Sequence, residues 1–233
     1  NLIDSVSLDI VINNHNSKWI NSFINNDAFI DNKIATISPD FNLNEYIFAH
    51  QIAKKIPEGS NIFIGNSLMI RAFNSFSKKG SNKIRFFSNR GVSGIDGNLS
   101  TALGIASQSK KNNYLIIGDQ SFIHDIGSLH ILAQNNTNLT IFIMNNYGGA
   151  IFDHLPALNQ IDSHMFKNYI RNEHSINFKS IVKSYELEYE EIKSINDLKN
   201  ITMEEMKVYE ISIDNKDSLK FIRQFSTSLY QQT

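Results

Sequence analysis

The sequence contains no cysteine, only 3 proline residues and a single tryptophan. Without cysteine the chain cannot form disulfides, zinc–thiolate sites or iron–sulfur clusters, and it has no cysteine nucleophile. The scarcity of proline, together with 41% hydrophobic and 19% charged residues, argues against a disordered or collagen-like chain. The lack of cysteine also fits a reducing compartment, so we expect a cytoplasmic protein.

Neither sign of charge is in large excess, since the chain has 22 Lys and Arg residues and 23 Asp and Glu residues. No overall basic field would therefore draw the chain onto nucleic acid. No stretch approaches the roughly 20 apolar residues that a membrane-spanning helix needs. We expect a packed globular fold, with no nucleic-acid partner and no membrane span.

The opening of the chain differs from the rest. Residues 1–42 are rich in Asn and Asp, start without Met or a signal sequence, and show no convincing strand pattern. We interpret them as a tail or a remnant of something longer. Residues 43–233 are expected to form one domain.

Strand and helix patterns alternate through residues 43–233. Short β-rich runs occur at residues 62–65, 84–88, 114–118, 139–144 and 208–213, with a weaker run near Tyr189. Helical patterns lie between them at residues 67–76, 96–107, 126–133, 178–185 and 219–225. This order predicts an α/β fold with a parallel sheet flanked by helices on both faces, because parallel strands need crossover connections.

Two polar segments follow neighbouring runs of the predicted sheet. Asp119 and Asn146 lie 27 residues apart, about one strand–helix–strand crossover, and Gly148 and Gly149 come just after. A carboxylate, an amide oxygen and a turn carbonyl form the all-oxygen ligand set that Mg²⁺ prefers. The alternative is a helix-capping Asp and an ordinary Asn turn.

A glycine-rich segment, residues 88–97, follows the second β-rich run and opens a helix. Glycines before a helix suit anion binding through backbone N–H groups, although a simple glycine-rich turn is equally consistent. Ser67 is placed to cap a helix, and Arg71 follows one turn later. Arg71 and Arg90 stand out in a chain that prefers Lys, and an arginine fork suits carboxylates; the alternative is ordinary surface arginines.

The pair His124–Asp125 follows Asp119 closely. Such a pair can act in general acid–base chemistry, but we favour a packing or helix-capping role.

Together these segments resemble the diphosphate-binding domain of thiamine diphosphate enzymes, whose signature is Gly-Asp followed after about 25 to 30 residues by Asn-Asn. Within that superfamily they resemble the 2-succinyl-5-enolpyruvyl-6-hydroxy-3-cyclohexene-1-carboxylate synthase (MenD) family. The similar strings are residues 65–68, 88–97, 118–125 and 145–152. The resemblance covers roughly residues 43–233, and it makes residues 1–42 the end of a preceding central domain or a linker.

The resemblance implies a role for each matching residue. Asp119, Asn146 and the Gly148 carbonyl would bind Mg²⁺, and Gly118 and Ser121 would contact thiamine diphosphate. Ile95 would support the bent cofactor. The substrate side would be lined by Ser67, Arg71, Arg90, Ile151 and Phe152. Gln120, Tyr147 and Ala150 depart from the expected pattern.

The implied reaction is decarboxylation of 2-oxoglutarate and addition of the succinyl semialdehyde unit to isochorismate, in menaquinone or phylloquinone biosynthesis. The activating Glu of the superfamily would lie in amino-terminal domains outside this chain, which alone would be inactive. A homo-oligomer, dimer or tetramer, is also implied. The alternatives are an acetolactate synthase-like enzyme, a 2-oxo acid decarboxylase, or a noncatalytic Mg²⁺–diphosphate binding module.

Overall fold

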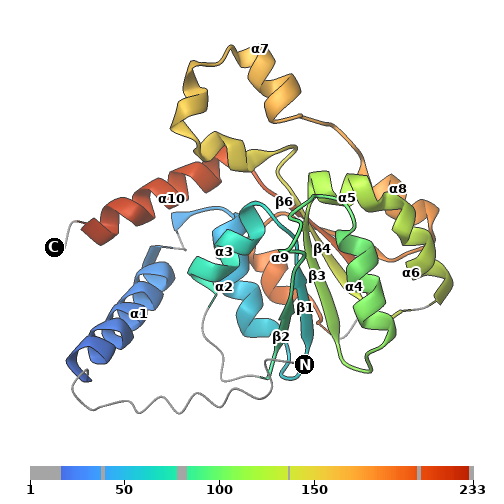
Figure 1. The fold of residues 1–233 in the computed structure, drawn as a ribbon, viewed down its shortest axis with the longest axis horizontal. Coiled ribbons are helices and arrows are strands. Elements are labelled where there is room, and N and C mark those ends of the chain that lie inside the picture. Colours follow the sequence, from blue (N-terminus) through green and yellow to red (C-terminus); the bar gives the residue numbers. More distant parts are fainter. Residues whose placement is uncertain (1–16, 38–39, 78–82, 136, 204–205, 231–233) are drawn as a thin grey trace.

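A computed structural model describes residues 17–37, 40–77, 83–135, 137–203 and 206–230. Its centre is a six-stranded sheet in the order β2-β1-β3-β4-β6-β5, and every pair of neighbours is parallel. The strands are β1 (Asn61–Ile64), β2 (Arg85–Phe87), β3 (Asn113–Gly118), β4 (Thr140–Asn145), β5 (Tyr189–Ile192) and β6 (Val208–Ser212). The predicted parallel α/β fold is confirmed, including the weak strand near Tyr189 (Figure 1).

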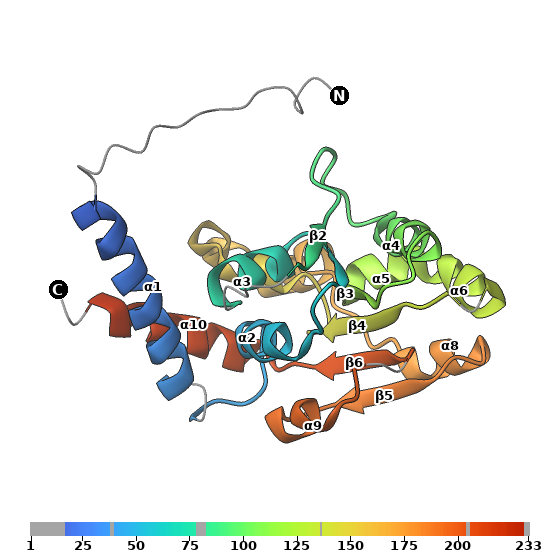
Figure 2. The same cartoon turned by 90° about the horizontal axis from the view of Figure 1, so that it is seen from below.

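Helices connect the strands and cover both faces of the sheet (Figure 2). The α-helices are α1 (Ser17–Ile37), α2 (Glu45–Lys55), α3 (Leu68–Phe76), α4 (Asn98–Ser107), α5 (Asp119–Asp125), α6 (Leu129–Asn135), α7 (Ser163–Met165), α8 (Phe178–Ser184), α9 (Ile195–Asn200) and α10 (Asn215–Tyr230). Shorter 3-10 turns are η3 (Ile126–Ser128), η4 (Ala150–His154) and η5 (Pro156–Gln160), and η6 (Phe166–Ile170) is a π-helix.

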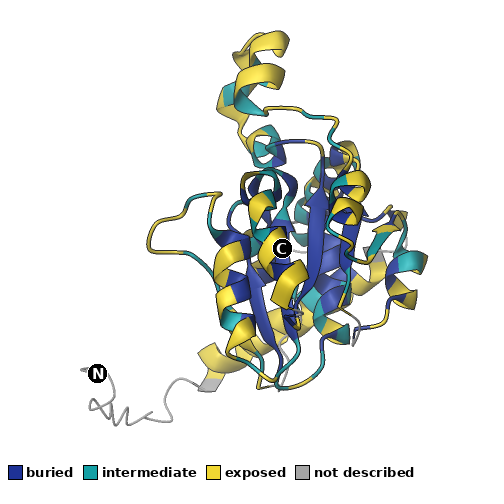
Figure 3. Cartoon of the chain, turned by 90° about the vertical axis from the view of Figure 1, so that its right-hand side faces the viewer, coloured by how far each residue is buried: buried dark blue, intermediate teal, exposed yellow. Residues whose placement is uncertain are grey.

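The core consists of two clusters, one on each face of the sheet. Successive residues of a strand point to opposite faces, so Ile62 and Ile64 join the cluster under α2, α3 and α10, while Phe63 joins the one under α4 and α8. Because both faces are covered, β3 and β4 are buried along nearly their whole length, which explains their continuous apolar runs (Figure 3). No described helix is long and apolar enough to cross a membrane.

Residues 1–16 and 38–39 of the segment assigned to a preceding domain or linker lie outside the described residues. Residues 17–37 form α1, whose Ile34 is only 1% exposed and belongs to the first core cluster. By contrast, Trp19 and Phe23 on the same helix are 63% and 59% exposed. One end of α1 is therefore anchored to this domain.

The helical patterns were correct in place but not always in extent. The helix expected over residues 126–133 is divided between η3 and α6, and a separate helix, α5, precedes them directly after β3. The helix expected over residues 219–225 is part of the longer α10.

The expected capping role holds for Asp125 but not for Ser67. The Asp125 carboxylate accepts hydrogen bonds from Gly97 N at 2.8 Å and Leu99 N at 2.7 Å, so it caps α4 from another helix. Ser67 has φ 73° and makes no side-chain cap bond. A capping Ser needs extended backbone to reach the next amides, so the prediction for Ser67 was wrong.

Replacing Asp125 by Ala should lower the free energy of unfolding by about 2 kcal/mol, because two amides at the start of α4 lose their acceptor. Urea unfolding followed by circular dichroism measures this change. The exposed neighbour provides a control, since His124→Ala should leave stability within about 0.5 kcal/mol of the parent chain. Equal stability of the two variants would contradict the capping role.

Candidate functional site

A cavity of about 270 Å³ opens at the carboxyl ends of the central strands. Ligands bind at this edge in open parallel sheets. The cavity brings together nine of the eleven predicted site residues: Ser67, Ile95, Gly118, Asp119, Ser121, Asn146, Gly148, Ile151 and Phe152. Among them Ser121 is buried, whereas Ile95 and Phe152 are 39% and 37% exposed. The grouping fits a common site, and the individual roles stay predictions.

Asp119 links the ends of β3 and β4. These strands are neighbours, with Gly118 in register with Met144, so the residues after them emerge together as the sequence predicted. The Asp119 side chain is buried, and its Oδ2 accepts a hydrogen bond from Gly148 N at 2.9 Å. Its Oδ1 accepts one from Gln120 N at 2.6 Å. The carboxylate is thus held in place while keeping lone pairs for another ligand.

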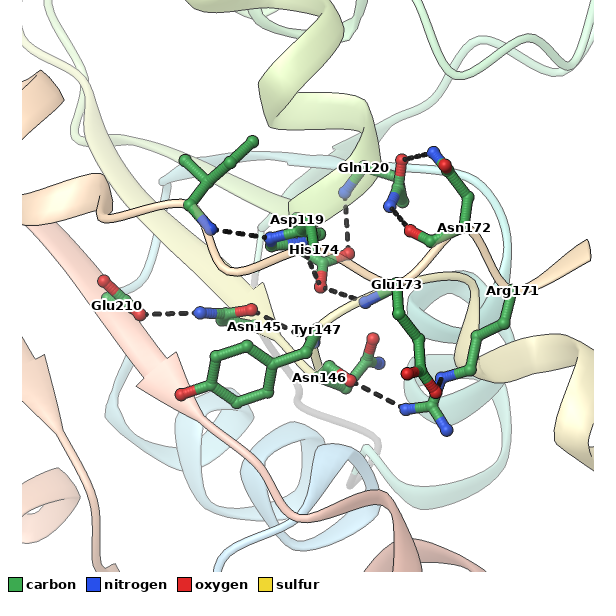
Figure 4. Close-up of polar contacts among 12 residues, drawn as sticks. Asp119, Gln120, Asn145, Asn146, Tyr147, Arg171, Asn172, Glu173, His174 and Glu210 are labelled. Carbon is green, nitrogen blue, oxygen red and sulfur yellow. Dashed lines mark hydrogen bonds and ion pairs between the residues drawn. The ribbon is translucent and has the colours of Figure 1, made fainter. Parts of the chain in front are cut away.

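The two adjacent asparagines at the end of β4 make different contacts (Figure 4). Asn145 donates from Nδ2 to Glu210 Oε1 at 2.7 Å, and its Oδ1 accepts from Tyr147 N at 3.1 Å. Asn146 donates from Nδ2 to Glu45 Oε1 at 2.8 Å, but its buried Oδ1 has no hydrogen-bond partner among the described residues. A buried amide oxygen without a partner is costly, and a bound cation would satisfy it.

Gly148 occupies a position that only glycine fits. Its φ is 145°, and a Cβ built there would lie 2.7 Å from the carbonyl oxygen of Arg171. Its own carbonyl accepts from Ala150 N at 2.9 Å, which leaves one lone pair unused. The glycine signal in the sequence therefore reflects a close backbone approach beside Asp119.

The segment Arg171–His174 packs against the same loop, and sequence reasoning missed it (Figure 4). Arg171 Nη2 donates to the Asn146 carbonyl at 2.9 Å, and its Nη1 lies 3.2 Å from Asp153 Oδ2. His174 Nδ1 accepts from Ile176 N at 3.3 Å, and its Nε2 lies 3.2 Å from Asp119 Oδ2. The one available signal was that Arg171 is another arginine in a chain that prefers Lys.

These observations test whether the residues fit a divalent cation. No cluster of three His, Asp or Glu side chains among the described residues could hold a metal, so a cation here would need amide and carbonyl oxygens beside Asp119. The unpartnered oxygen of Asn146 and the remaining lone pairs of Asp119 and Gly148 would supply that set, and their role as ligands stays a prediction. Hard oxygen donors with a single carboxylate suit Mg²⁺ that also binds phosphate oxygens.

Arg71 and Arg90 do not line this cavity. They line a neighbouring one of about 670 Å³, together with side chains of α3 and β2. Arg71 Nη1 donates to the carbonyl of Ser67 at 2.5 Å, and Arg90 Nη1 donates to Asn66 Oδ1 at 2.9 Å. Ser67 lines the cavity beside Asp119, whereas both arginines line the adjacent one and bond to residues 66 and 67, so their common role on the substrate side stays a prediction.

Comparison with known proteins identifies the domain. The family described as "Thiamine pyrophosphate enzyme, C-terminal TPP binding domain" matches residues 64–222. The chain belongs to this thiamine pyrophosphate enzyme family. The matched residues include β3, β4 and the whole turn between Asn145 and Gly149, and every residue that lines the cavity except Glu45 lies within them.

Several curated relatives share one name. The chain is similar to the 2-succinyl-5-enolpyruvyl-6-hydroxy-3-cyclohexene-1-carboxylate synthases of Lysinibacillus sphaericus (32% identical, covering 78% of this chain and 32% of that protein) and Syntrophus aciditrophicus (34%, covering 80% and 33%). It is likewise similar to the synthase of Roseiflexus castenholzii (40%, covering 62% and 25%). The chain spans about a third of the length of the first two relatives.

His154, in η4 beyond Phe152, gives the fold a pH dependence. Burial lowers the pKa of His154 below its usual value, although the nearby Glu45 and Asp153 carboxylates act in the opposite direction. The unfolded chain therefore binds a proton at His154 more readily than the folded chain does. The stability that comes from the neutral, buried His154 is present above about pH 6.5 and is lost as the pH falls. In urea unfolding at pH 7.5 and 5.5, His154→Gln should lose less stability on acidification than the parent chain; an equal loss would contradict this.

Proposed function

We propose that this chain supplies the Mg²⁺–diphosphate half of the active site of a thiamine diphosphate-dependent synthase. The observation that carries the proposal is the buried, unpartnered Oδ1 of Asn146 beside the Asp119 carboxylate, within a domain of the thiamine pyrophosphate enzyme family. Asp119, Asn146 and the Gly148 carbonyl would hold the cation, and Gly118, Ser121 and Ile95 would contact the cofactor. When bound, thiamine diphosphate supplies an electron sink for cleavage next to a carbonyl group.

The proposed reaction is the one that the resemblance to the synthase family implies, and the shared name of the similar proteins supports it. The whole enzyme would decarboxylate 2-oxoglutarate and add the succinyl semialdehyde unit to isochorismate, as a step of menaquinone or phylloquinone biosynthesis. Arg71 and Arg90 would pair with substrate carboxylates in the adjacent cavity, and Ile151 and Phe152 would form an apolar wall that excludes water.

Activation of the cofactor is proposed to come from outside this chain. Glu45 also lines the cavity, but its carboxylate oxygens accept hydrogen bonds from Asn146 and Ser218, and we do not assign the activating role to it. We assign that role to a Glu in amino-terminal domains of the same enzyme. A homo-oligomer, dimer or tetramer, would complete the site.

Asp119→Ala should lower the Mg²⁺-dependent affinity for thiamine diphosphate by about 100-fold or more, since a direct ligand should matter at least as much as an outer-shell residue. Calorimetric titration of the full-length enzyme with cofactor and Mg²⁺ measures it. Asp162→Ala, which removes an exposed carboxylate capping α7, is the control and should leave affinity unchanged. Undiminished retention in Asp119→Ala would refute the cation site.

Arg71→Ala and Arg90→Ala should each raise KM for 2-oxoglutarate or isochorismate by about 10-fold to 100-fold, because a charged hydrogen bond to a carboxylate is lost, while cofactor binding persists. Steady-state kinetics of the full-length enzyme distinguish the two effects. Arg85→Ala, at an exposed position of β2, is the matched control. Equal use of pyruvate and 2-oxoglutarate would instead favour an acetolactate synthase-like or decarboxylase activity.

A further inference from the structure

Glu45 is a charged side chain buried where charge is costly. It is the first residue of α2 and is 0% exposed. Its Oε1 accepts a hydrogen bond from Asn146 Nδ2 at 2.8 Å, and its Oε2 accepts one from the Ser218 hydroxyl of α10. A buried carboxylate is tolerated only when such donors satisfy it, so removing it should change the hydrogen bonds that Asn146 and Ser218 make.

The partner of Glu45 is an amide whose two ends have nearly the same shape. An Asn side chain can present either its oxygen or its NH₂ group to a site, and its hydrogen-bond partners decide which. An ionised carboxylate only accepts hydrogen bonds, so Glu45 can pair only with Nδ2 of Asn146. The oxygen must then face the opposite side, where it is buried beside the cavity without a partner.

The position of the carboxylate is itself fixed by the start of α2. Asn44 Oδ1 accepts hydrogen bonds from Tyr46 N at 3.1 Å and Ile47 N at 3.0 Å, and so anchors the first turn that carries Glu45. The neighbouring Asn145 is held by Glu210 in the same manner, but its oxygen accepts from Tyr147 N. Of the two asparagines, Asn146 alone keeps an oxygen for a ligand.

We propose that Glu45 is a positioning residue that orients the Asn146 amide so that Oδ1 faces a bound divalent cation. This inference rests on the cation site of the proposed function. Glu45 makes no contact with the cation in this scheme; it acts by holding the ligand in the orientation needed for binding before the cation arrives.

Two conservative variants separate orientation from charge. Gln at position 45 loses the charge but can present its carbonyl oxygen to Asn146 Nδ2 and its NH₂ group to Ser218. Asp keeps the charge but is shorter by about 1.5 Å and cannot reach Asn146. Positioning predicts that Glu45→Gln keeps cation affinity within about 3-fold and that Glu45→Asp loses about 10-fold to 100-fold; charge attraction alone predicts the reverse.

The measurement is the dissociation constant of Mn²⁺, as a paramagnetic probe for the Mg²⁺ site, titrated by electron paramagnetic resonance into the full-length enzyme with thiamine diphosphate present. Ser218→Ala is the control, because it removes the other partner of Glu45 and leaves the Asn146 contact; affinity should stay within about 3-fold. Circular dichroism verifies folding. If one Glu45 variant does not fold, the affinity of the other still tests the proposal, because the expected affinity of each variant does not depend on that of the other.

A double substitution tests whether Glu45 acts through Asn146. Asn146→Ala should weaken Mn²⁺ binding, and adding Glu45→Asp to it should cause no further loss. Three results would overturn the positioning role while leaving the cation site intact. They are full affinity in Glu45→Asp, a loss of 10-fold or more in Glu45→Gln, and additive losses in the double variant. Unchanged affinity in both Asn146→Ala and Asp119→Ala would instead overturn the cation site and the inference together.

Discussion

The parallel pairing of β3 with β4 is the constraint on which the site depends. Its register sets Gly118 beside Met144, so the chain leaves both strands at one edge, and the hydrogen bond from Gly148 N to Asp119 Oδ2 ties the two turns together. A one-residue slip would point every strand side chain to the opposite face, and the two apolar clusters prevent it. The core therefore determines the geometry of the polar edge.

Buried polar groups hold the loop after β4 in place. Glu45 and Glu210 are buried carboxylates on opposite sides of the loop after β4, and each accepts a hydrogen bond from one asparagine amide. Hydrogen bonds to α2 and β6, two elements far apart in the sequence, thus hold the Asn-Asn pair in place. These hydrogen bonds make the pair rigid, and the oxygen that they leave without a partner belongs to Asn146.

Most of the fold could be predicted from the sequence, because fully buried parallel strands such as β3 and β4 give continuous apolar runs that crossover helices separate. Much of the site followed too, since strand order placed Asp119 and Asn146 together. Partners contributed by distant segments could not be predicted. Glu45 is an ordinary acidic residue at a helix start, and nothing local shows that it meets Asn146 or that His174 lies beside Asp119.

Asn66 links the two neighbouring cavities, which are built from different elements of the fold. Asn66 donates from its amide nitrogen to the carbonyls of Asn89 and Gly94, and its oxygen accepts from Arg90. It lines the cavity beside Asp119, while Arg90 lines the other. The arginine-lined cavity is built mainly by α3 and β2, whereas the turns after β3 and β4 carry Asp119 and Asn146, so substitutions that reshape the first cavity fall on different elements from those that anchor the second.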